Sequence, residues 1–105
     1  MDLRGHLDLL LLTALRRIEP GHGYALITAL REQSAGTFDL PEGTVYPALH
    51  RLERDGLVQS EWSTESGRRR RVYRLTQAGA DAVTVKQQEW TIFQAGVRAV
   101  VEGWA

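Results

Sequence analysis

Five arginines lie within a short stretch of the chain, and their type and spacing suit the binding of phosphate groups. They are Arg68, Arg69, Arg70, Arg71 and Arg74, and no acidic residue interrupts them. The whole chain is electrically neutral, with 13 Lys and Arg residues against 13 Asp and Glu residues. A focused cluster of guanidinium groups on a neutral protein indicates a binding site, because diffuse basicity would only produce weak attraction everywhere.

A second polar set lies upstream, on one face of a predicted helix. The opposite face of this helix is apolar and is formed by Val45, Leu49 and Leu52 at helical spacing. The polar set itself is Thr44, Pro47, Ala48 and Arg51. Arg51 could bond a base edge or a phosphate, Thr44 a phosphate, and the small Ala48 would permit close approach to a groove. An ordinary solvated face is the alternative for an isolated helix of this kind.

Three aromatic residues near these two sets could each either contact a nucleic acid or pack within the protein. Tyr24 begins another predicted helix, where a hydroxyl and the helix N-terminus can together hold a phosphate. We favour this role for Tyr24 over a position in the core. Tyr46 and His50 lie on the flank of the polar helix face, and for each of them DNA contact and packing are equally open.

Hydrophobic periodicity places both polar sets on regular elements. Apolar spacing predicts helices over 3–18 and 22–34, then the helix that bears Arg51, and a last helix from about 77 to the C-terminus. Residues 58–63 and 69–75 alternate as strands about a turn and predict a β-hairpin. This order predicts a mainly α fold with a small β-hairpin, a winged helix-turn-helix followed by one C-terminal dimerisation helix.

Pro47 indicates where the Arg51 helix begins, because a proline inside a helix removes a hydrogen bond and clashes with the preceding turn. With Thr44 as the N-cap, Pro47 falls at the third helical position, where its N–H has no intrahelical partner. A start one turn earlier is the alternative. Thr76 is the expected N-cap of the last helix.

Only part of the arginine set can reach one ligand, because side chains alternate between the two faces of a strand. Arg68 and Arg69 lie nearest the tip of the hairpin and are expected to bind DNA, with Arg70 next. The remaining arginines are expected to pair with Glu61 or with Glu65.

The last helix carries an apolar repeat with a period of seven. Its first row is Val83, Trp90, Val97 and Trp104, and its second row holds Phe93 and Val100, with Lys86 as an interruption. A seam of this kind is typical of a helix that pairs with a second copy, so we expect a homodimer. Trp90 could also line an effector pocket at the dimer axis, since indole stacks on planar ligands, but dimer packing is the preferred role.

The composition and the remaining motifs exclude several classes of protein. The chain has no cysteine, and its three histidines are scattered over different helices, so we expect no metal site and no other cofactor. No nucleophile with a base beside it is visible, and an enzyme is not expected. The leucine run 9–12 lacks a basic leader region and is too short to cross a bilayer. We therefore expect a soluble cytoplasmic protein that does not bind membranes.

These residues also resemble a known family, the PadR family of transcriptional regulators. The resemblance covers roughly residues 7–80 and is very specific where the third-helix block is joined to the arginine hairpin. Its motifs are Gly23-Tyr24, Pro41 to Glu53, Asp55-Gly56-Leu57-Val58, Glu61-Trp62, Gly67-Arg68-Arg69-Arg70, Tyr73-Arg74-Leu75-Thr76 and Gly79. The resemblance implies a dimeric winged-helix repressor, often relieved by a small aromatic or drug-like ligand. The chain has a single predicted helix after the hairpin, and in this it resembles the short-tailed branch of the family.

The sequence thus predicts a repressor that binds a palindromic operator in double-stranded DNA as a homodimer. Residues 1–76 form the DNA-binding part and residues 77–105 the dimerisation helix, within one structural unit. The competing hypothesis is a protein-interaction module that has kept the winged-helix shape without DNA binding. The arginine hairpin and the polar helix face speak against that alternative. Salt dependence of binding separates the two, because phosphate binding releases counterions.

Overall fold

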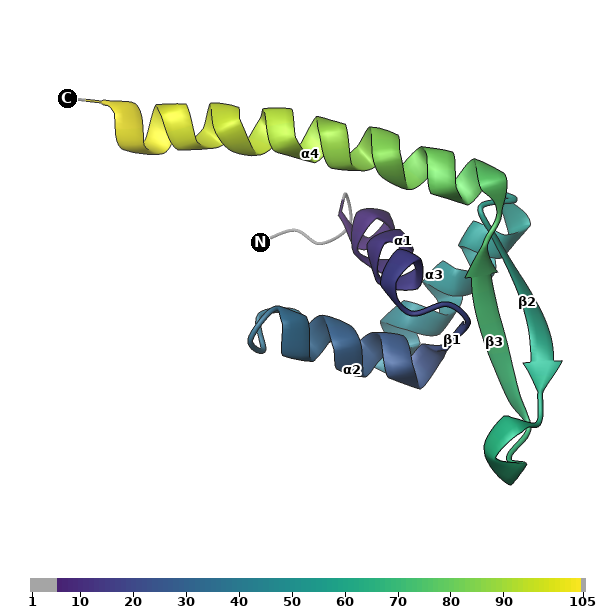
Figure 1. The fold of residues 1–105 in the computed structure, drawn as a ribbon. Helices are drawn as coiled ribbons and strands as arrows, with labels where there is room; N and C mark the ends of the chain where they lie inside the picture. Colours follow the sequence, from purple (N-terminus) through teal and green to yellow (C-terminus); the bar gives the residue numbers. More distant parts are fainter. Residues whose placement is uncertain (1–5, 105) are drawn as a thin grey trace.

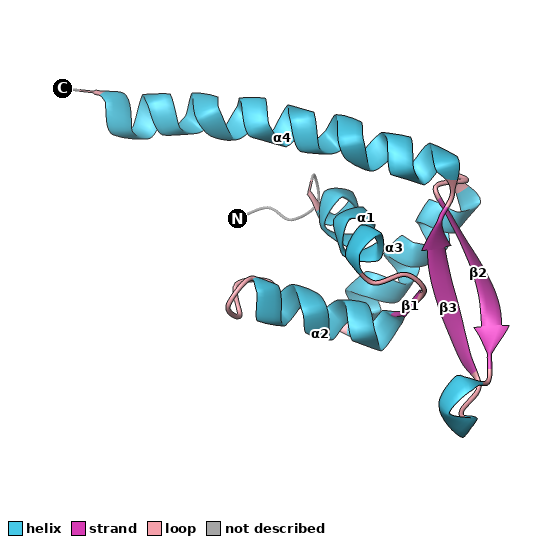
Figure 2. Cartoon of the chain, viewed as in Figure 1, coloured by secondary structure: helices cyan, strands magenta, loops and turns pink. Residues whose placement is uncertain are grey.

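The computed structural model describes residues 6–104, in which helices surround a leucine-rich core and a β-hairpin extends from it (Figures 1 and 2). Its elements in chain order are α1 (Leu7–Arg17), β1 (Gly21–His22), α2 (Gly23–Gln33), α3 (Glu42–Arg54), β2 (Val58–Ser63), β3 (Arg70–Leu75) and α4 (Gln77–Gly103). A 3-10 turn, Glu65–Gly67, joins β2 to β3. The predicted winged helix-turn-helix order is confirmed. The predicted helix start at residue 3 lies outside the described residues.

The core forms where α1, α2, α3, the hairpin and the start of α4 meet. α1 is apolar around most of its circumference, and a helix of that kind has to be covered on most sides. It contacts α2, α3, β3 and α4. The largest fully buried side chains of the core are Leu11, Leu12, Leu15, Leu26, Val45, Leu49, Leu52, Val58, Tyr73 and Val83. Burial of this apolar surface is the main force that holds the helices together.

The sheet has three antiparallel strands in the order β1-β3-β2. Ser60 pairs with Tyr73 and Trp62 with Arg71, which places these four residues on one face of the hairpin. The two residues of β1, Gly21 and His22, pair with Tyr73 and Val72 on the other edge of β3. The hairpin was predicted from the sequence, whereas β1 was not, because two residues carry no readable periodicity.

α3 begins at Glu42 with Pro41 as its N-cap residue, so the prediction of Thr44 as the N-cap is wrong. The N–H groups of Thr44 and Val45 both donate to the Pro41 carbonyl, at 3.0 and 3.1 Å. The earlier start left open by the sequence is the observed one, and Pro47 lies inside the helix. In the second turn the proline removes a single bond, to the carbonyl of Gly43. Burial of the apolar face of α3 offsets that loss.

α4 starts as predicted, since the Thr76 hydroxyl accepts a hydrogen bond from the N–H of Gly79 at 3.0 Å. Its first turns belong to the core, where Val83 is fully buried. The prediction that Val83 takes part in the dimer seam is therefore wrong, because its own chain already covers it. Arg16 of α1 also holds the first turns of α4 against α1, because it donates a hydrogen bond to the Ala80 carbonyl at 2.9 Å. The middle of α4 passes the start of α1, where His6 contacts Trp90 and Phe93, and its C-terminal part extends past the other elements (Figure 1).

Replacing Gly79 by alanine should lower the free energy of unfolding by about 3 kcal/mol. A Cβ at this position would lie 1.9 Å from the carbonyl oxygen of Leu57, which also accepts a hydrogen bond from the Thr76 N–H. The start of α4 would have to move away from the hairpin. Urea unfolding measures the effect. Gly43→Ala is the control, because a Cβ there meets nothing within 4 Å, and equal stability of the two variants would contradict the close approach.

Candidate nucleic-acid interface

The outward face of α3 carries most of the polar set that the sequence singled out. Pro47 and His50 are exposed and Thr44 is half-buried. Together with Arg51 and Arg54 they line a shallow surface hollow. Ala48 also lines this hollow, although only 4% of it is exposed. Its small side chain lies between the polar face and the buried face, and its predicted role in close approach to a groove stays a prediction.

Arg51 is held by Asp8 of α1 in a two-pronged ion pair. Its Nη1 donates to Asp8 Oδ2 at 3.0 Å, and its Nη2 donates to Oδ1 at 2.6 Å. The hydrogen bonds to this carboxylate raise the pKa of Arg51 above its ordinary value. The sequence suggested no partner for Arg51, since Asp8 lies in another helix. A guanidinium has five N–H donors, so the pair fixes its plane and leaves three donors for a further ligand.

Two of the hairpin arginines are engaged by neighbours within the domain. Arg71 donates from Nε to the Ser60 hydroxyl at 2.8 Å and lies 3.9 Å from the carboxylate of Glu53. Arg74 Nε lies 3.6 Å from the carboxylate of Glu61. The predicted pairing with Glu61 is thus confirmed. Because these two charges are compensated locally, the positive charge of the hairpin is concentrated toward its tip.

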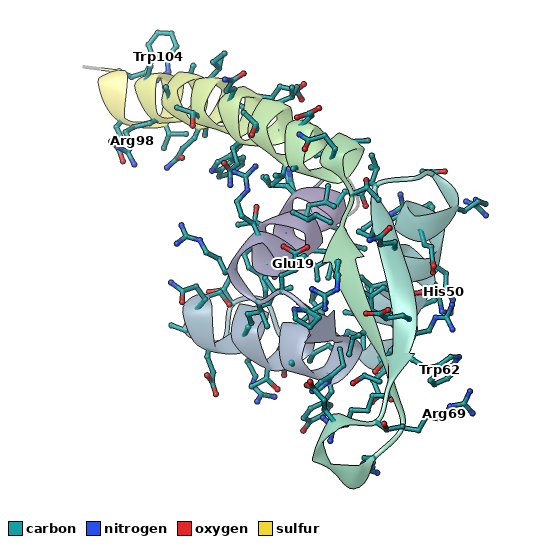
Figure 3. All side chains as sticks on the ribbon, turned by 45° about the vertical axis from the view of Figure 1, so that its right-hand side comes forward. Glu19, His50, Trp62, Arg69, Arg98 and Trp104 are labelled. Atoms are coloured by element: carbon teal, nitrogen blue, oxygen red, sulfur yellow. The ribbon has the colours of Figure 1, made fainter. Side chains whose placement is uncertain are left out.

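Arg68 and Arg69 are exposed near that tip, as their place in the sequence suggested. Figure 3 shows Arg69 and Trp62 extending from the hairpin side by side. The guanidinium of Arg69 lies 4.2 Å from the centre of the Trp62 ring, and that of Arg71 lies 5.3 Å from it. A cation stacked on an indole keeps its charge and loses some of its freedom. Trp62 therefore positions Arg69, a role that was not predicted from the sequence.

A hollow of about 500 Å³ lies between the hairpin and the start of α2. Its lining residues come from β1, α2, α3 and the hairpin: His22, Tyr24, Tyr46, Trp62, Arg68, Arg69, Arg70 and Arg71. None of them is acidic, so the hollow is strongly electropositive. The predicted phosphate contacts Tyr24, Arg68, Arg69 and Arg70 therefore share one surface. Their binding to phosphate stays a prediction.

The aromatic residues of this hollow differ in their packing. Tyr24 is 60% exposed, so the alternative of a core position is wrong for it. Tyr46 is half-buried and lies so close to Gly23 that a Cβ on this glycine would be 2.5 Å from its ring. Tyr46 therefore has the packing role that the sequence left open, and contact with DNA stays a prediction for it. His22 caps α2, because its Nδ1 accepts from the N–H of Ala25 at 3.2 Å.

The second half of α4 displays the apolar residues predicted to form the dimer seam. The exposed members are Trp90 (37%), Phe93 (57%), Val97 (44%), Val100 (58%) and Trp104 (80%). Trp90 lies edge-on to His6, with their ring centres 5.4 Å apart, and borders a hollow of about 310 Å³ that Phe93 also lines.

α4 is not long and apolar enough to cross a membrane, and the same holds for every other helix in residues 6–104. Within that range no three His, Cys, Asp or Glu side chains are grouped so that they could hold a metal ion.

A polar recognition helix, a preceding helix that braces it and an arginine-bearing hairpin define a winged helix-turn-helix domain. Residues 11–85 match the sequence model of the transcriptional regulator PadR-like family, and the chain belongs to this family. Members of the family are DNA-binding transcription regulators and not enzymes.

Individual relatives agree with this assignment. A transcriptional regulator of Mycobacterium tuberculosis is 52% identical over 54 residues, a match that spans 51% of this chain and 50%, about half, of that relative. A transcriptional regulator from Clostridium thermocellum has a similar structure, with a TM-score of 0.85 at 28% identity over 95% of this chain and 97% of that one. A PadR family transcription regulator from Clostridium difficile gives a TM-score of 0.82 at 34% identity, over 92% and 99% of the two chains.

Replacing Trp62 by leucine should weaken DNA binding about threefold, which corresponds to the loss of an exposed cation–π contact. The dependence of affinity on salt should not change, because Arg69 keeps its charge. Fluorescence anisotropy with a labelled duplex over a series of salt concentrations measures both quantities. Trp62→Tyr retains an aromatic face and should recover most of the loss. If tyrosine binds no better than leucine, Trp62 does not position Arg69 through its ring.

Proposed function

We propose that this protein is a cytoplasmic repressor of transcription that binds a palindromic operator as a homodimer. The observation that carries the proposal is the exposed arginine tip beside the exposed polar face of α3, in a chain of the PadR-like family. A helix fits the major groove, where base edges present distinct donor and acceptor patterns. The hairpin supplies cations for the adjacent phosphates, which fix the protein on the duplex without reading its sequence.

In this proposal α3 reads bases through Thr44, Pro47, His50 and Arg51. Arg51 is the strongest candidate, because a guanidinium can bond a guanine with two parallel hydrogen bonds. The ion pair with Asp8 holds its plane in place before DNA arrives and so reduces the entropy lost on binding. Tyr24 and the arginines of the tip bind phosphates on either side of the groove.

The exposed apolar residues of α4 support the proposed dimerisation through this helix. Trp90, Phe93, Val97 and Val100 lie on one side of the helix and are 37%, 57%, 44% and 58% exposed, although Trp90 and Phe93 also contact His6. A soluble protein rarely leaves so long an apolar row open to water. We therefore place the dimer seam from Trp90 to Trp104, and Val83 stays in the core of each subunit.

Relief of repression by a small aromatic or drug-like effector is part of the same proposal. The hollow beside Trp90 is lined by His6 and Phe93 together with Lys86 and Glu89, so it combines aromatic surfaces with both signs of charge. A planar ligand could stack on the indole there. Simple packing of Trp90 against the second subunit is the competing role and is favoured by the continuity of the seam.

Arg68→Ala and Arg69→Ala should weaken binding to all DNA sequences about equally. If each arginine makes one phosphate contact, the slope of log affinity against log salt should fall by roughly one in each variant. Anisotropy titrations on two unrelated duplexes give this slope. Arg31→Ala, in α2 and away from the hollow, is the matched control. Steep salt dependence is not expected of a protein-interaction module, so its absence in the unmodified protein would favour that alternative.

Trp90→Glu combined with Val97→Glu should give monomers that bind the operator poorly, because two buried carboxylates per helix would have to lose their hydration. Sedimentation velocity measures the oligomeric state. Val85→Glu combined with Ile92→Glu is the matched control. These two residues have the same seven-residue spacing and are 51% and 74% exposed, but Ile92 lies on the side of α4 away from Trp90. A dimer that survives the first pair of changes, or dissociates equally with the second, would contradict the seam.

A further inference from the structure

His22 makes two short contacts that a single imidazole cannot satisfy. The backbone N–H of Ala25 lies 3.2 Å from Nδ1, and Nη1 of Arg70 lies 2.8 Å from Nε2. A backbone N–H and a guanidinium can only donate hydrogen bonds. A neutral imidazole has one nitrogen that accepts, and its other nitrogen carries a hydrogen. One of the two contacts is therefore between two donors.

The helix cap decides which contact is satisfied. The Ala25 N–H is one of the groups at the start of α2 that have no partner inside the helix, so it needs the lone pair on Nδ1. The hydrogen of His22 then sits on Nε2 and points at Arg70. Protonation of the ring would add a second clash, between Nδ1–H and the Ala25 N–H. Burial and the charge of Arg70 lower the pKa of His22, in keeping with a neutral ring.

Two donors 2.8 Å apart repel each other and leave no room for an atom between them, so a shared acceptor has to approach both from the open side of the hollow. The contact lies in the electropositive hollow, whose lining includes Tyr24 and Tyr46 and no acidic residue. An anionic oxygen is the acceptor that a guanidinium and a neutral N–H both prefer. The first turn of α2 adds the partial positive charge of a helix N-terminus.

We propose that His22 and Arg70 bind the same phosphate of the DNA backbone, with Nε2–H and the guanidinium donating to it. The inference rests on the proposed function and adds His22 to its DNA-binding residues. A backbone phosphate is the source that fits, because the hollow continues to the exposed Arg68 and Arg69 at the hairpin tip. One strand of a duplex can therefore follow the same surface.

The test uses a pair of substitutions that separate the two nitrogens of His22. In His22→Asn the side-chain oxygen can still cap α2, but no donor remains at the position of Nε2. This variant should melt near the unmodified protein and bind a random-sequence DNA duplex roughly tenfold more weakly, the loss expected for a hydrogen bond to a charged group. In His22→Gln the amide nitrogen can take the place of Nε2, so binding should be largely retained while the cap is weakened.

Arg70→Ala should also lower the affinity and reduce the salt slope by roughly one, whereas His22→Asn should leave the slope unchanged because the ring is neutral. The double variant should bind only slightly more weakly than Arg70→Ala, because both residues serve one phosphate. Arg74→Gln is the control, since Arg74 lies on the same strand, pairs with Glu61 and does not line the hollow.

The outcomes separate this inference from the proposed function. No salt-dependent binding of the duplex by the unmodified protein would overturn the proposed function, and the inference with it. Normal binding by His22→Asn, or additive losses in the double variant, would overturn the shared phosphate alone. A free-phosphate site is distinguished by following the His22 ring with nitrogen-15 NMR. A ring shift with inorganic phosphate and none with the duplex would exclude the DNA backbone as the source.

Discussion

The length of α4 is the constraint on which the rest of the structure depends. Its 27 residues extend about 40 Å, which is longer than the domain beneath it can cover. The first turns are fixed by the burial of Val83 and by the close approach of Gly79 to the Leu57 carbonyl. The remaining turns carry apolar side chains into water. The start of α4 is therefore held against the domain by packing, and a second subunit paired along α4 would be placed at a distance and angle set by this helix.

A neutral chain can still bind a polyanion, because its acidic residues are placed to neutralise particular arginines. Glu53 and Glu61 compensate Arg71 and Arg74 at the base of the hairpin, and Asp8 compensates Arg51 on α3. The tip retains its charge. Trp62 then orients Arg69 without reducing that charge. Local ion pairing thus concentrates the positive electrostatic potential at one site. An overall excess of lysine and arginine would instead produce non-specific binding over the whole surface.

Most of the fold could be predicted because it depends on burying apolar side chains. Buried side chains recur at the spacing of a helix or a strand, and this spacing is visible in the sequence. The leucines of α1, the alternation of β2 and β3 and the Thr76 cap are local signals. Val83 shows the limit, since a seven-residue repeat indicates a covered face but does not say which chain covers it. Asp8 and Arg51 are 43 positions apart, and β1 is two residues long, so neither carried a signal. Trp62 could have been found from the hairpin register, which pairs it with Arg71.

The two surfaces assigned to DNA and to the second subunit are joined through α1. Near its N-terminus, Asp8 holds Arg51 of the recognition helix by two hydrogen bonds. At its C-terminus, Arg16 donates to the Ala80 carbonyl and to the Thr84 hydroxyl of α4, both at 2.9 Å. Between these ends its leucines are packed without space to adjust independently. A displacement of α4 therefore has to be shared by α1, and a movement of α1 would shift the guanidinium of Arg51 through its bonds to Asp8. The fold thus contains a continuous mechanical connection from the helix that would pair subunits to the helix that would read bases.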